Sequence, residues 1–435
     1  MLRIITQQAE AKTELRRICD RNFDFEIRSK EEIVREVLQT VKLQGDRGLL
    51  DYTAKFDRQV LTPEQLRVSG SEIDAAYQQV DKELIDAIKL ASKRIEDFHR
   101  QRIPQSWVHF AEDDVVLGKR YTPVDKAGIY VPGGRASYPS TVLMNAIPAQ
   151  VAGVPRLVMV TPPGPEGRIN SAVLVAATEA GVEEIYRVGG AQAIGALAYG
   201  TETIPQVDVI TGPGNIYVTL AKKMVYGVVG IDSLAGPSEV LIIADRSANP
   251  VYVATDMLAQ AEHDPMAAAI LLTTETELAT KVQAEVKLQL QEHPRRMYTE
   301  KAIANYGLIV VVGSLEEAAE LSNLFAPEHL ELEVKDPWAT LEYIRHAGAI
   351  FLGSSTPEAV GDYLAGPNHT LPTSGAARYA SALGVETFLK HSSLIQYSPT
   401  ALNKMSKAIQ LLAEAEGLTS HGDSVKFRTD GLVDN

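Results

Sequence analysis

Apolar and charged residues alternate at helical spacing through roughly the first hundred residues of the chain. The segments 31–38 (EEIVREVL) and 84–90 (LIDAIKL) place Ile, Val and Leu three or four positions apart, with charged residues between them. This spacing is typical of amphipathic helices that bury one face. Because the segment has neither a glycine-rich turn nor a group of histidines, we expect a helical scaffold without catalytic groups.

Short apolar runs replace this pattern from about residue 120 onward. The runs at 157–160 (LVMV), 185–188 (IYRV) and 207–210 (VDVI) each lead into a turn that contains glycine or proline. Intervals of about 20–30 residues between such runs are typical of βα units in a parallel sheet. We therefore expect these turns to share the edge formed by the carboxyl ends of the strands, where open α/β sheets bind ligands.

A second group of apolar runs lies at 240–243, 270–272, 308–312 and 349–352. The sequence therefore predicts an α/β fold with two parallel-sheet domains. We expect residues 121–238 to form one domain, inserted into a second domain in which residues 239–385 pack with the helical part at 1–120.

The apolar runs stop near residue 386, so no strand is expected beyond that point. Residues 401–417 have the pattern of one amphipathic helix, and a polar segment follows them. Residues 386–435 are therefore predicted to be a helical C-terminal tail.

The composition limits the classes of function. The chain has 435 residues and a net charge of -14 at pH 7, and no basic run follows the pattern of a nucleic-acid-binding surface. Its single cysteine, Cys19, excludes an internal disulfide and a CxxC metal site. No signal-peptide pattern and no apolar stretch of about 18 residues is present. We therefore expect a cytoplasmic protein that binds neither a membrane nor nucleic acid.

Three glycine turns are candidates for binding a nucleotide. They are Tyr130-Val131-Pro132-Gly133-Gly134, Gly189-Gly190-Ala191-Gln192 and Gly212-Pro213-Gly214-Asn215. Glycines at strand ends let the backbone approach a phosphate, and the following helix supplies N–H donors. The GxGxxG pattern of a complete dinucleotide-binding fold is absent, and each turn alone is equally typical of a simple connection. Three such turns on one expected edge favour a nucleotide-like ligand.

Two short segments pair a histidine with a second functional side chain. Gln260 and His263 lie three positions apart on an expected helix, so they share one face. They could supply two ligands to Zn²⁺ or form an ordinary solvated face. Glu328 and His329 follow Pro327, and in a turn both side chains can face one cleft. A carboxylate beside an imidazole is a good acid–base pair, although a surface turn has the same pattern.

Further candidates lie nearer the C-terminus. Asp362 and His369 belong to a segment rich in glycine and proline, which predicts a loop. Glu416 and His421 lie in the polar tail, where a chain ordinarily lacks a fixed structure. Neither pair alone indicates a function.

Taken in order, these segments closely resemble histidinol dehydrogenases over essentially the whole chain. The resemblance is carried by 128–134 (GIYVPGG), 212–215 (GPGN), 231–239 (IDSLAGPSE), 260–263 (QAEH), 326–330 (APEHL), 361–363 (GDY) and 366–373 (GPNHTLPT). It implies a zinc- and NAD-dependent enzyme that oxidises L-histidinol through L-histidinal to L-histidine with two NAD⁺, the last step of histidine biosynthesis. It also implies two incomplete Rossmann-like domains, which agrees with the missing GxGxxG pattern.

The resemblance assigns a role to each candidate residue. The implied ligands of one Zn²⁺ per subunit are Gln260, His263, Asp362 and His421. The implied acid–base pair is Glu328 and His329. The implied substrate contacts are Ser238, His329, His369 and Glu416, together with the metal ligands. The implied NAD⁺ contacts are Tyr130, Gln192 and Asn215. The family forms intertwined homodimers, so His421 is expected to complete the active site of the partner subunit.

The implied chemistry agrees with the residue types. His329 would remove a proton in both oxidations, and Glu328 would activate water against the aldehyde. Cys19 lies apart from every segment above, so water rather than a thiol is the expected nucleophile. Three other readings are an enzyme with the same machinery that oxidises a different amino- or sulfo-alcohol, a zinc hydrolase, and a non-catalytic binding protein. Glu416 and His369 favour histidinol, and formation of NADH would separate a dehydrogenase from a hydrolase.

Overall fold

The structure, a computed structural model, describes residues 2–22, 27–133 and 137–430. Gly134, part of the first glycine turn, lies outside these residues. The chain forms two compact units, which are described separately: unit 1 is Met1–Gln101 with Val124–Phe388, and unit 2 is Arg102–Pro123 with Leu389–Asn435. No helix in the described segments is long and apolar enough to cross a membrane.

A six-stranded parallel sheet forms one half of unit 1, with the strand order β1-β11-β10-β9-β12-β13. Its strands are β1 (Arg3–Ile5), β9 (Glu239–Ala244), β10 (Ala268–Thr273), β11 (Gly307–Val311), β12 (His329–Glu333) and β13 (Ala349–Leu352). The central strands consist almost wholly of apolar residues, because helices bury both of their faces. The chain order reverses between β9 and β12, so the switch point of this sheet lies there.

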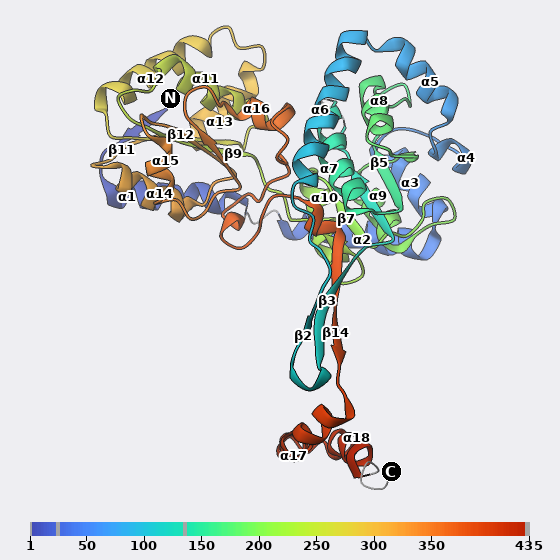
Figure 1. The fold of residues 1–435 in the computed structure, drawn as a ribbon. Helices are drawn as coiled ribbons and strands as arrows, with labels where there is room; N and C mark the ends of the chain where they lie inside the picture. The colour runs from blue at the N-terminus through green and yellow to red at the C-terminus, as the bar shows by residue number, and fades with distance from the viewer. Residues whose placement is uncertain (1, 23–26, 134–136, 431–435) are drawn as a thin grey trace. The chain divides into compact units, whose positions relative to one another are not determined.

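Helices lie on both faces of this sheet (Figure 1). One apolar core joins it to α11 (Pro250–Ala261), α12 (Thr276–Gln289) and α13 (Arg296–Tyr306). A second core joins it to α1 (Gln8–Cys19) and α14 (Leu315–Phe325). The short helices α15 (Pro337–Leu341) and α16 (Glu358–Tyr363) follow β12 and β13.

A five-stranded parallel sheet forms the other half of unit 1, with the order β6-β5-β4-β7-β8. Its strands are β4 (Lys126–Tyr130), β5 (Arg156–Thr161), β6 (Glu184–Arg187), β7 (Val209–Thr211) and β8 (Gly230–Ile231). The helices between them are α7 (Pro139–Ala152), α8 (Ser171–Glu179), α9 (Gly190–Tyr199) and α10 (Ile216–Val225). Because every pair is parallel, the three glycine turns share the carboxyl edge. Two of them flank the switch point between β4 and β7.

The N-terminal helices divide between the two sheets. Besides α1 they are α2 (Ile27–Gln44), α3 (Asp46–Phe56), α4 (Pro63–Leu66), α5 (Gly70–Gln79) and α6 (Lys82–Arg100). Helix α2 packs on α9 and α10, and residues of α2, α3 and α4 join the core of the five-stranded sheet. Helices α5 and α6 pack on α8 and α7. Among the described N-terminal residues, β1, α1 and the turn Asp20–Asn22 therefore accompany the six-stranded sheet, which differs from the expectation that all of 1–120 packs with 239–385.

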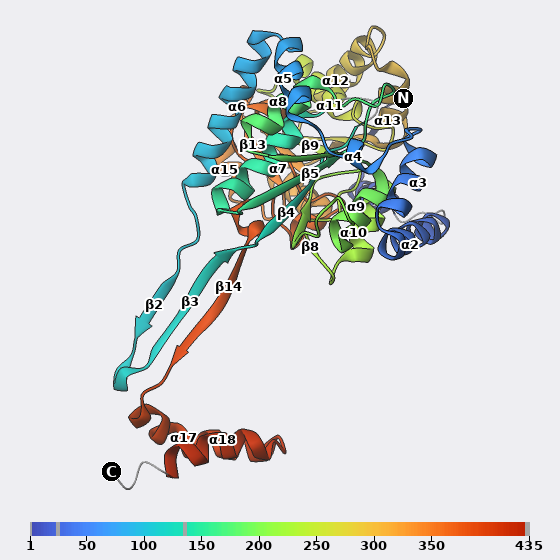
Figure 2. The ribbon, with the colours of Figure 1, turned by 90° about the vertical axis from the view of Figure 1, so that its right-hand side faces the viewer.

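Unit 2 contains a three-stranded antiparallel sheet, in the order β14-β3-β2, and two helices (Figure 2). The elements are β2 (Trp107–Phe110), β3 (Val116–Pro123), β14 (Leu389–Gln396), α17 (Pro399–Ala415) and α18 (Thr419–Thr429). The prediction that strands stop near residue 386 is wrong. Strand β14 has the sequence LKHSSLIQ, whose polar centre gives no strand pattern, and its backbone pairing with β3 fixes it instead.

The segment after residue 417 was also expected to lack a fixed structure, and this expectation is wrong. Gly417, at φ +71°, turns the chain between α17 and α18. The two helices pack on each other, and the hydroxyls of Ser406 and Thr429 are 3.1 Å apart across their interface. His421 therefore lies on a helix.

Candidate active site

The expected acid–base pair lies at the amino ends of two neighbouring strands, β9 and β12. His329 is the first residue of β12, and Glu328 precedes it. The backbone of Glu239, the first residue of β9, holds both side chains. Its N–H donates to Glu328 Oε2 at 2.9 Å, and its carbonyl accepts a hydrogen bond from His329 Nδ1 at 2.9 Å.

This contact fixes the protonation of the His329 ring. A carbonyl oxygen only accepts, so Nδ1 carries the hydrogen and Nε2 keeps its lone pair. Nε2 is buried and has no hydrogen-bond partner among the described residues. Burial lowers the pKa of His329 to about 3, so the ring is neutral near pH 7. His329 can therefore accept a proton only at Nε2.

Glu328 is a buried carboxyl group 3.8 Å from His329 Nδ1. Burial, and then the nearby carboxylate of Glu239, raise the pKa of Glu328 well above its ordinary value. Such a group is a stronger base toward water than an exposed carboxylate once it is ionised. The side chain of Glu239 is itself paired with Arg21 at 3.0 Å, and both groups are almost fully buried.

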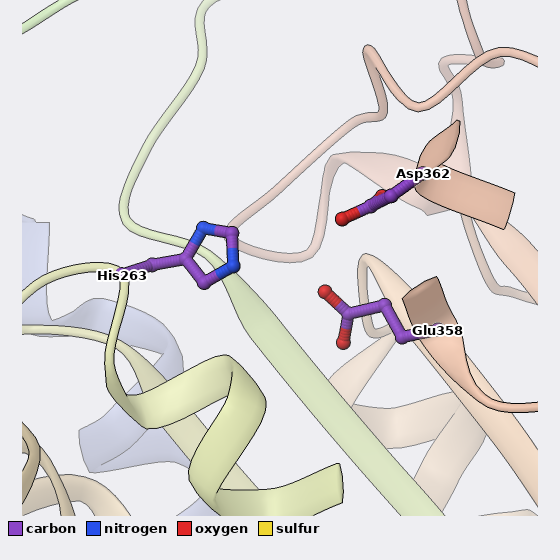
Figure 3. A group of neighbouring side chains, drawn as sticks. All are labelled: His263, Glu358 and Asp362. Atoms are coloured by element: carbon purple, nitrogen blue, oxygen red, sulfur yellow. The ribbon is translucent and has the colours of Figure 1, made fainter. Parts of the chain in front are cut away.

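A nitrogen and two carboxylate groups converge beside this pair (Figure 3). Ligand atoms of His263, Glu358 and Asp362 all lie within 4.8 Å of one another. Glu358 and Asp362 are four positions apart on α16, so one helix face carries both. Burial raises the pKa of Asp362 to about 6, and burial and the charge of Asp362 raise the pKa of Glu358 well above normal. Clustered carboxylates disfavour ionisation unless a cation joins them, and nitrogen with oxygen donors suits Zn²⁺.

Gln260, near the end of α11, lies fully buried against the same cluster. Its amide can take two orientations. With the nitrogen toward Glu358, it donates to the Glu358 carboxylate at 2.5 Å, and its oxygen accepts from the Glu239 N–H at 2.8 Å. With the oxygen toward Glu358, two acceptors face each other. A cation, or a proton on Glu358, removes this conflict.

The remaining substrate candidates divide between the two units. His369 Nδ1 lies 3.1 Å from the backbone oxygen of Asp362, and burial lowers the pKa of His369 to about 4. Ser238 directly precedes β9. Glu416 and His421 belong to unit 2, where Glu416 ends α17 and His421 lies on α18, and both are exposed. Their part in the site stays a prediction.

The expected cofactor residues lie at the carboxyl edge of the five-stranded sheet. The Gly190 N–H donates to the hydroxyl of Tyr130 at 3.2 Å, which joins the first two glycine turns. Gln192 donates to Asp57 at 3.2 Å, and its amide oxygen is buried without a partner among the described residues. Asn215 caps α10 by accepting from the Tyr217 N–H at 3.0 Å. Tyr130, at the end of β4, and Asn215, which follows β7, thus lie on either side of the switch point, where doubly wound sheets bind ligands.

Comparison with known proteins decides the family. The family model for histidinol dehydrogenase matches residues 21–429. "Histidinol dehydrogenase 2" of Trichormus variabilis is 77% identical over 98% of this chain and 99% of its own length. The enzyme of Synechococcus sp. is 70% identical over 99% of this chain and 100% of its own. The crystal structure of histidinol dehydrogenase from Elizabethkingia anophelis is 41% identical, with a TM-score of 0.88 over 92% of each chain.

The chain belongs to the histidinol dehydrogenase family. The predicted α/β fold with two parallel sheets is confirmed, as is the predicted activity, histidinol dehydrogenase at the last step of histidine biosynthesis. The zinc hydrolase and the non-catalytic protein find no support. The histidinol dehydrogenase family uses NAD and zinc, which agrees with the donor cluster and the glycine turns.

Three residues that contact the candidate site were not predicted from the sequence: Glu358, Glu239 and Arg21. Glu358 had a usable signal, because it lies one helical turn before Asp362. The pairing of Glu239 with Arg21 had no such signal, because 218 positions separate the two residues in the chain. The expected acid–base pair also lies at the amino edge of its sheet, whereas the general rule for α/β folds favours the carboxyl edge.

Proposed function

We propose that this chain oxidises L-histidinol to L-histidine in two steps and that Glu328 and His329 carry the proton chemistry of both. The observation that carries the proposal is the buried, unpartnered Nε2 of His329 next to a cluster of metal donors. A neutral imidazole whose proton is fixed on Nδ1 can accept a proton only through Nε2.

In the first step, His329 Nε2 takes the hydroxyl proton of histidinol while the carbinol carbon loses hydride. In the second step, Glu328 takes a proton from water while the oxygen of that water adds to the aldehyde carbon. After the proton from the first step has passed from His329 to solvent, His329 takes the hydroxyl proton of the water adduct while the same carbon loses the second hydride. The product is the carboxylate of histidine.

Water is the nucleophile because the chain offers no suitable thiol. Cys19 lies on α1, half-buried beside the second core of the six-stranded sheet. Burial, and then the charge of Glu239, raise the pKa of the Cys19 thiol. A protonated thiol is a poor nucleophile, so a covalent thiohemiacetal is not expected.

The metal-binding residues in our proposal are Gln260, His263 and Asp362 of one chain and His421 of a second chain. Bound Zn²⁺ would hold the imidazole and amine of the substrate, and bound NAD⁺ would accept the hydride. Ser238, His369 and Glu416 would contact the substrate beside these ligands. Tyr130, Gln192 and Asn215 would contact NAD⁺ at the carboxyl edge of the five-stranded sheet.

A homodimer with shared sites is supported by the surface of unit 2. Large apolar side chains lie exposed on its strands and helices, which is unusual for a surface that faces only water. Its sheet pairs β3, which comes before β4 in the chain, with β14, which follows residue 388. Glu416 and His421 come after β14, at the end of α17 and on α18. We propose that a second copy covers this surface, in the cytoplasm.

Replacing Glu328 by Gln tests the assignment directly. The amide cannot take a proton from water, so oxidation of histidinal should slow by about 10²–10⁴. Oxidation of histidinol to histidinal should slow much less, because His329 is unchanged. Stepwise turnover from each substrate, followed by NADH formation, measures both rates, and equal losses in the two steps would refute the role of Glu328.

A further inference from the structure

A buried carboxylate outside the proposed ligand set belongs to the donor cluster. Glu358 is 4% exposed, and it is one of the three side chains that converge in Figure 3. Its backbone N–H donates to Glu331 Oε1 at 3.0 Å, which fixes the start of α16 against β12. Its Oε1 also lies 3.7 Å from His329 Nδ1. Glu358 therefore touches both the metal cluster and the proton acceptor.

The Gln260 amide determines what Glu358 does. Nitrogen and oxygen occupy opposite ends of this amide, so a half-turn about its last side-chain bond exchanges them. In one orientation the nitrogen donates to Glu358 and the oxygen accepts from the Glu239 N–H. In the other, the oxygen faces Glu358 and the nitrogen faces the Glu239 N–H. A divalent cation beside the oxygen removes the conflict between the two acceptors and favours this orientation.

We propose that Glu358 is a positioning residue of the metal site, which holds Gln260 by its nitrogen before a divalent cation binds and supplies charge beside its oxygen afterwards. The inference rests on the proposed function, because it takes Gln260 as a ligand. In this proposal the amide turns when the cation binds, so that its oxygen replaces its nitrogen beside Glu358. The negative charge of Glu358 then offsets the positive charge of the cation.

Glu358→Gln keeps the shape of the side chain and removes its charge. The new amide oxygen can still accept from Gln260, so the hydrogen bond remains while the charge that favours the cation is lost. Residues next to metal ligands typically change metal affinity by about 10–100-fold when replaced. We expect a loss of that size in Zn²⁺ affinity, measured on the metal-stripped full chain by competition with a chromophoric chelator.

Two further variants separate charge from packing. Glu333→Gln replaces another buried carboxylate, at the far end of β12, and should keep the Zn²⁺ affinity within about twofold. Glu358→Asp keeps the charge and should bind Zn²⁺ more tightly than Glu358→Gln. In Co²⁺-loaded protein the visible absorption bands should move in Glu358→Gln and stay in place in Glu333→Gln. Circular dichroism establishes that each variant is folded.

The outcomes distinguish this inference from the proposed function. Wild-type affinity in Glu358→Gln would overturn the role of Glu358 and leave the metal site intact. An equal loss in Glu358→Asp and Glu358→Gln would overturn the argument from charge. Failure of the wild-type chain itself to bind Zn²⁺ would instead overturn the metal site of the proposed function.

Discussion

The two units of the chain differ in how many apolar side chains they bury, because the buried apolar residues lie almost all in unit 1. Unit 1 buries charged groups, such as Arg21 with Glu239, and its apolar core is formed by residues of the same chain. Unit 2 leaves large apolar side chains in the open: Phe110, Ile395 and Phe427 are 72–74% exposed. Unit 1 thus has its reactive groups fixed by its own chain. The exposed apolar side chains of unit 2 support the proposal that a second copy covers it.

The largest expected effect concerns a histidine of unit 1. His329→Asn can keep the hydrogen bond to the Glu239 carbonyl, but it removes the proton acceptor at Nε2. Both oxidations should slow by about 10²–10⁴, because each releases a proton from oxygen. Rates from histidinol and from histidinal measure this. His391→Asn, on the exposed strand β14 of unit 2, is the matched control and should leave both rates unchanged.

Unchanged oxidation of histidinol in His329→Asn would remove His329 as the base. A loss in His391→Asn as large as that in His329→Asn would show that the comparison between the units is mistaken.

The second prediction tests whether unit 2 serves a neighbouring chain. His421→Ala and Glu328→Gln are each expected to be inactive alone. After dissociation and random reassociation of an equal mixture, half of the dimers are mixed, and each mixed dimer has one site with both wild-type residues. Activity should return to about a quarter of the wild-type value if the sites are shared in a two-fold dimer. A mixture that stays inactive, although mixed dimers form, would place His421 in the site of its own chain.

The third prediction compares a buried leucine of unit 1 with an exposed leucine of unit 2, each replaced by alanine. Leu271→Ala creates a cavity in the fully buried strand β10 and should lower the free energy of unfolding by about 2–5 kcal/mol. Leu412 on α17 is 67% exposed, so Leu412→Ala should change the stability of the isolated chain by less than about 0.5 kcal/mol. Chemical denaturation at several protein concentrations measures both.

If a partner covers Leu412, the loss in Leu412→Ala should grow and depend on protein concentration, whereas that in Leu271→Ala should not. A small, concentration-independent effect of Leu412→Ala under conditions where the protein is dimeric would show that this face of α17 stays uncovered.

The smallest expected effect is a pH dependence in unit 1. Burial lowers the pKa of His99 on α6, and its Nε2 has no partner among the described residues. Above about pH 6.5 the ring is neutral in both folded and unfolded chains. Below that value the unfolded chain binds the proton more readily, so the stability contributed at neutral pH is lost as the pH falls.

Replacing His99 by Gln should therefore reduce the drop in Tm between pH 7.5 and 5.5, by no more than about 2 °C in a chain of this size. Thermal melts at the two pH values measure the difference. A Tm drop as large as that of the wild type would show that His99 plays no part in it.

The sequence predicts elements whose apolar residues form a recognisable pattern. It does not show elements that depend on pairing with a strand far away in the chain. The run 157–160 became β5, because apolar residues in a row suit a strand buried on both faces. Strand β14 is polar and exposed, so only its register with β3 defines it. Strand β1 is three residues long, too short for any pattern to show.

The same difference holds for the site. Gln260 and His263 could be paired from their spacing, although α11 ends at Ala261 and His263 lies in the turn after the helix rather than on it. Glu328 and His329 could be paired from their adjacency. The contacts of Glu328 and His329 with the backbone of Glu239 depend on β9 lying next to β12, which the strand order alone determines. Local spacing is visible in a sequence, whereas neighbours across a sheet are not.

The position of β1 has a consequence for how the protein is made on the ribosome. Arg3 pairs with Leu308, so 305 positions separate the two halves of that ladder. At a synthesis rate of about 5–20 residues per second, β1 waits some 15–60 s for its partner. The strands of the five-stranded sheet all emerge within that time. Strand β1 therefore leaves the ribosome long before its partner strand and is among the last strands to be paired, and a nascent chain that stops before β11 keeps β1 unpaired.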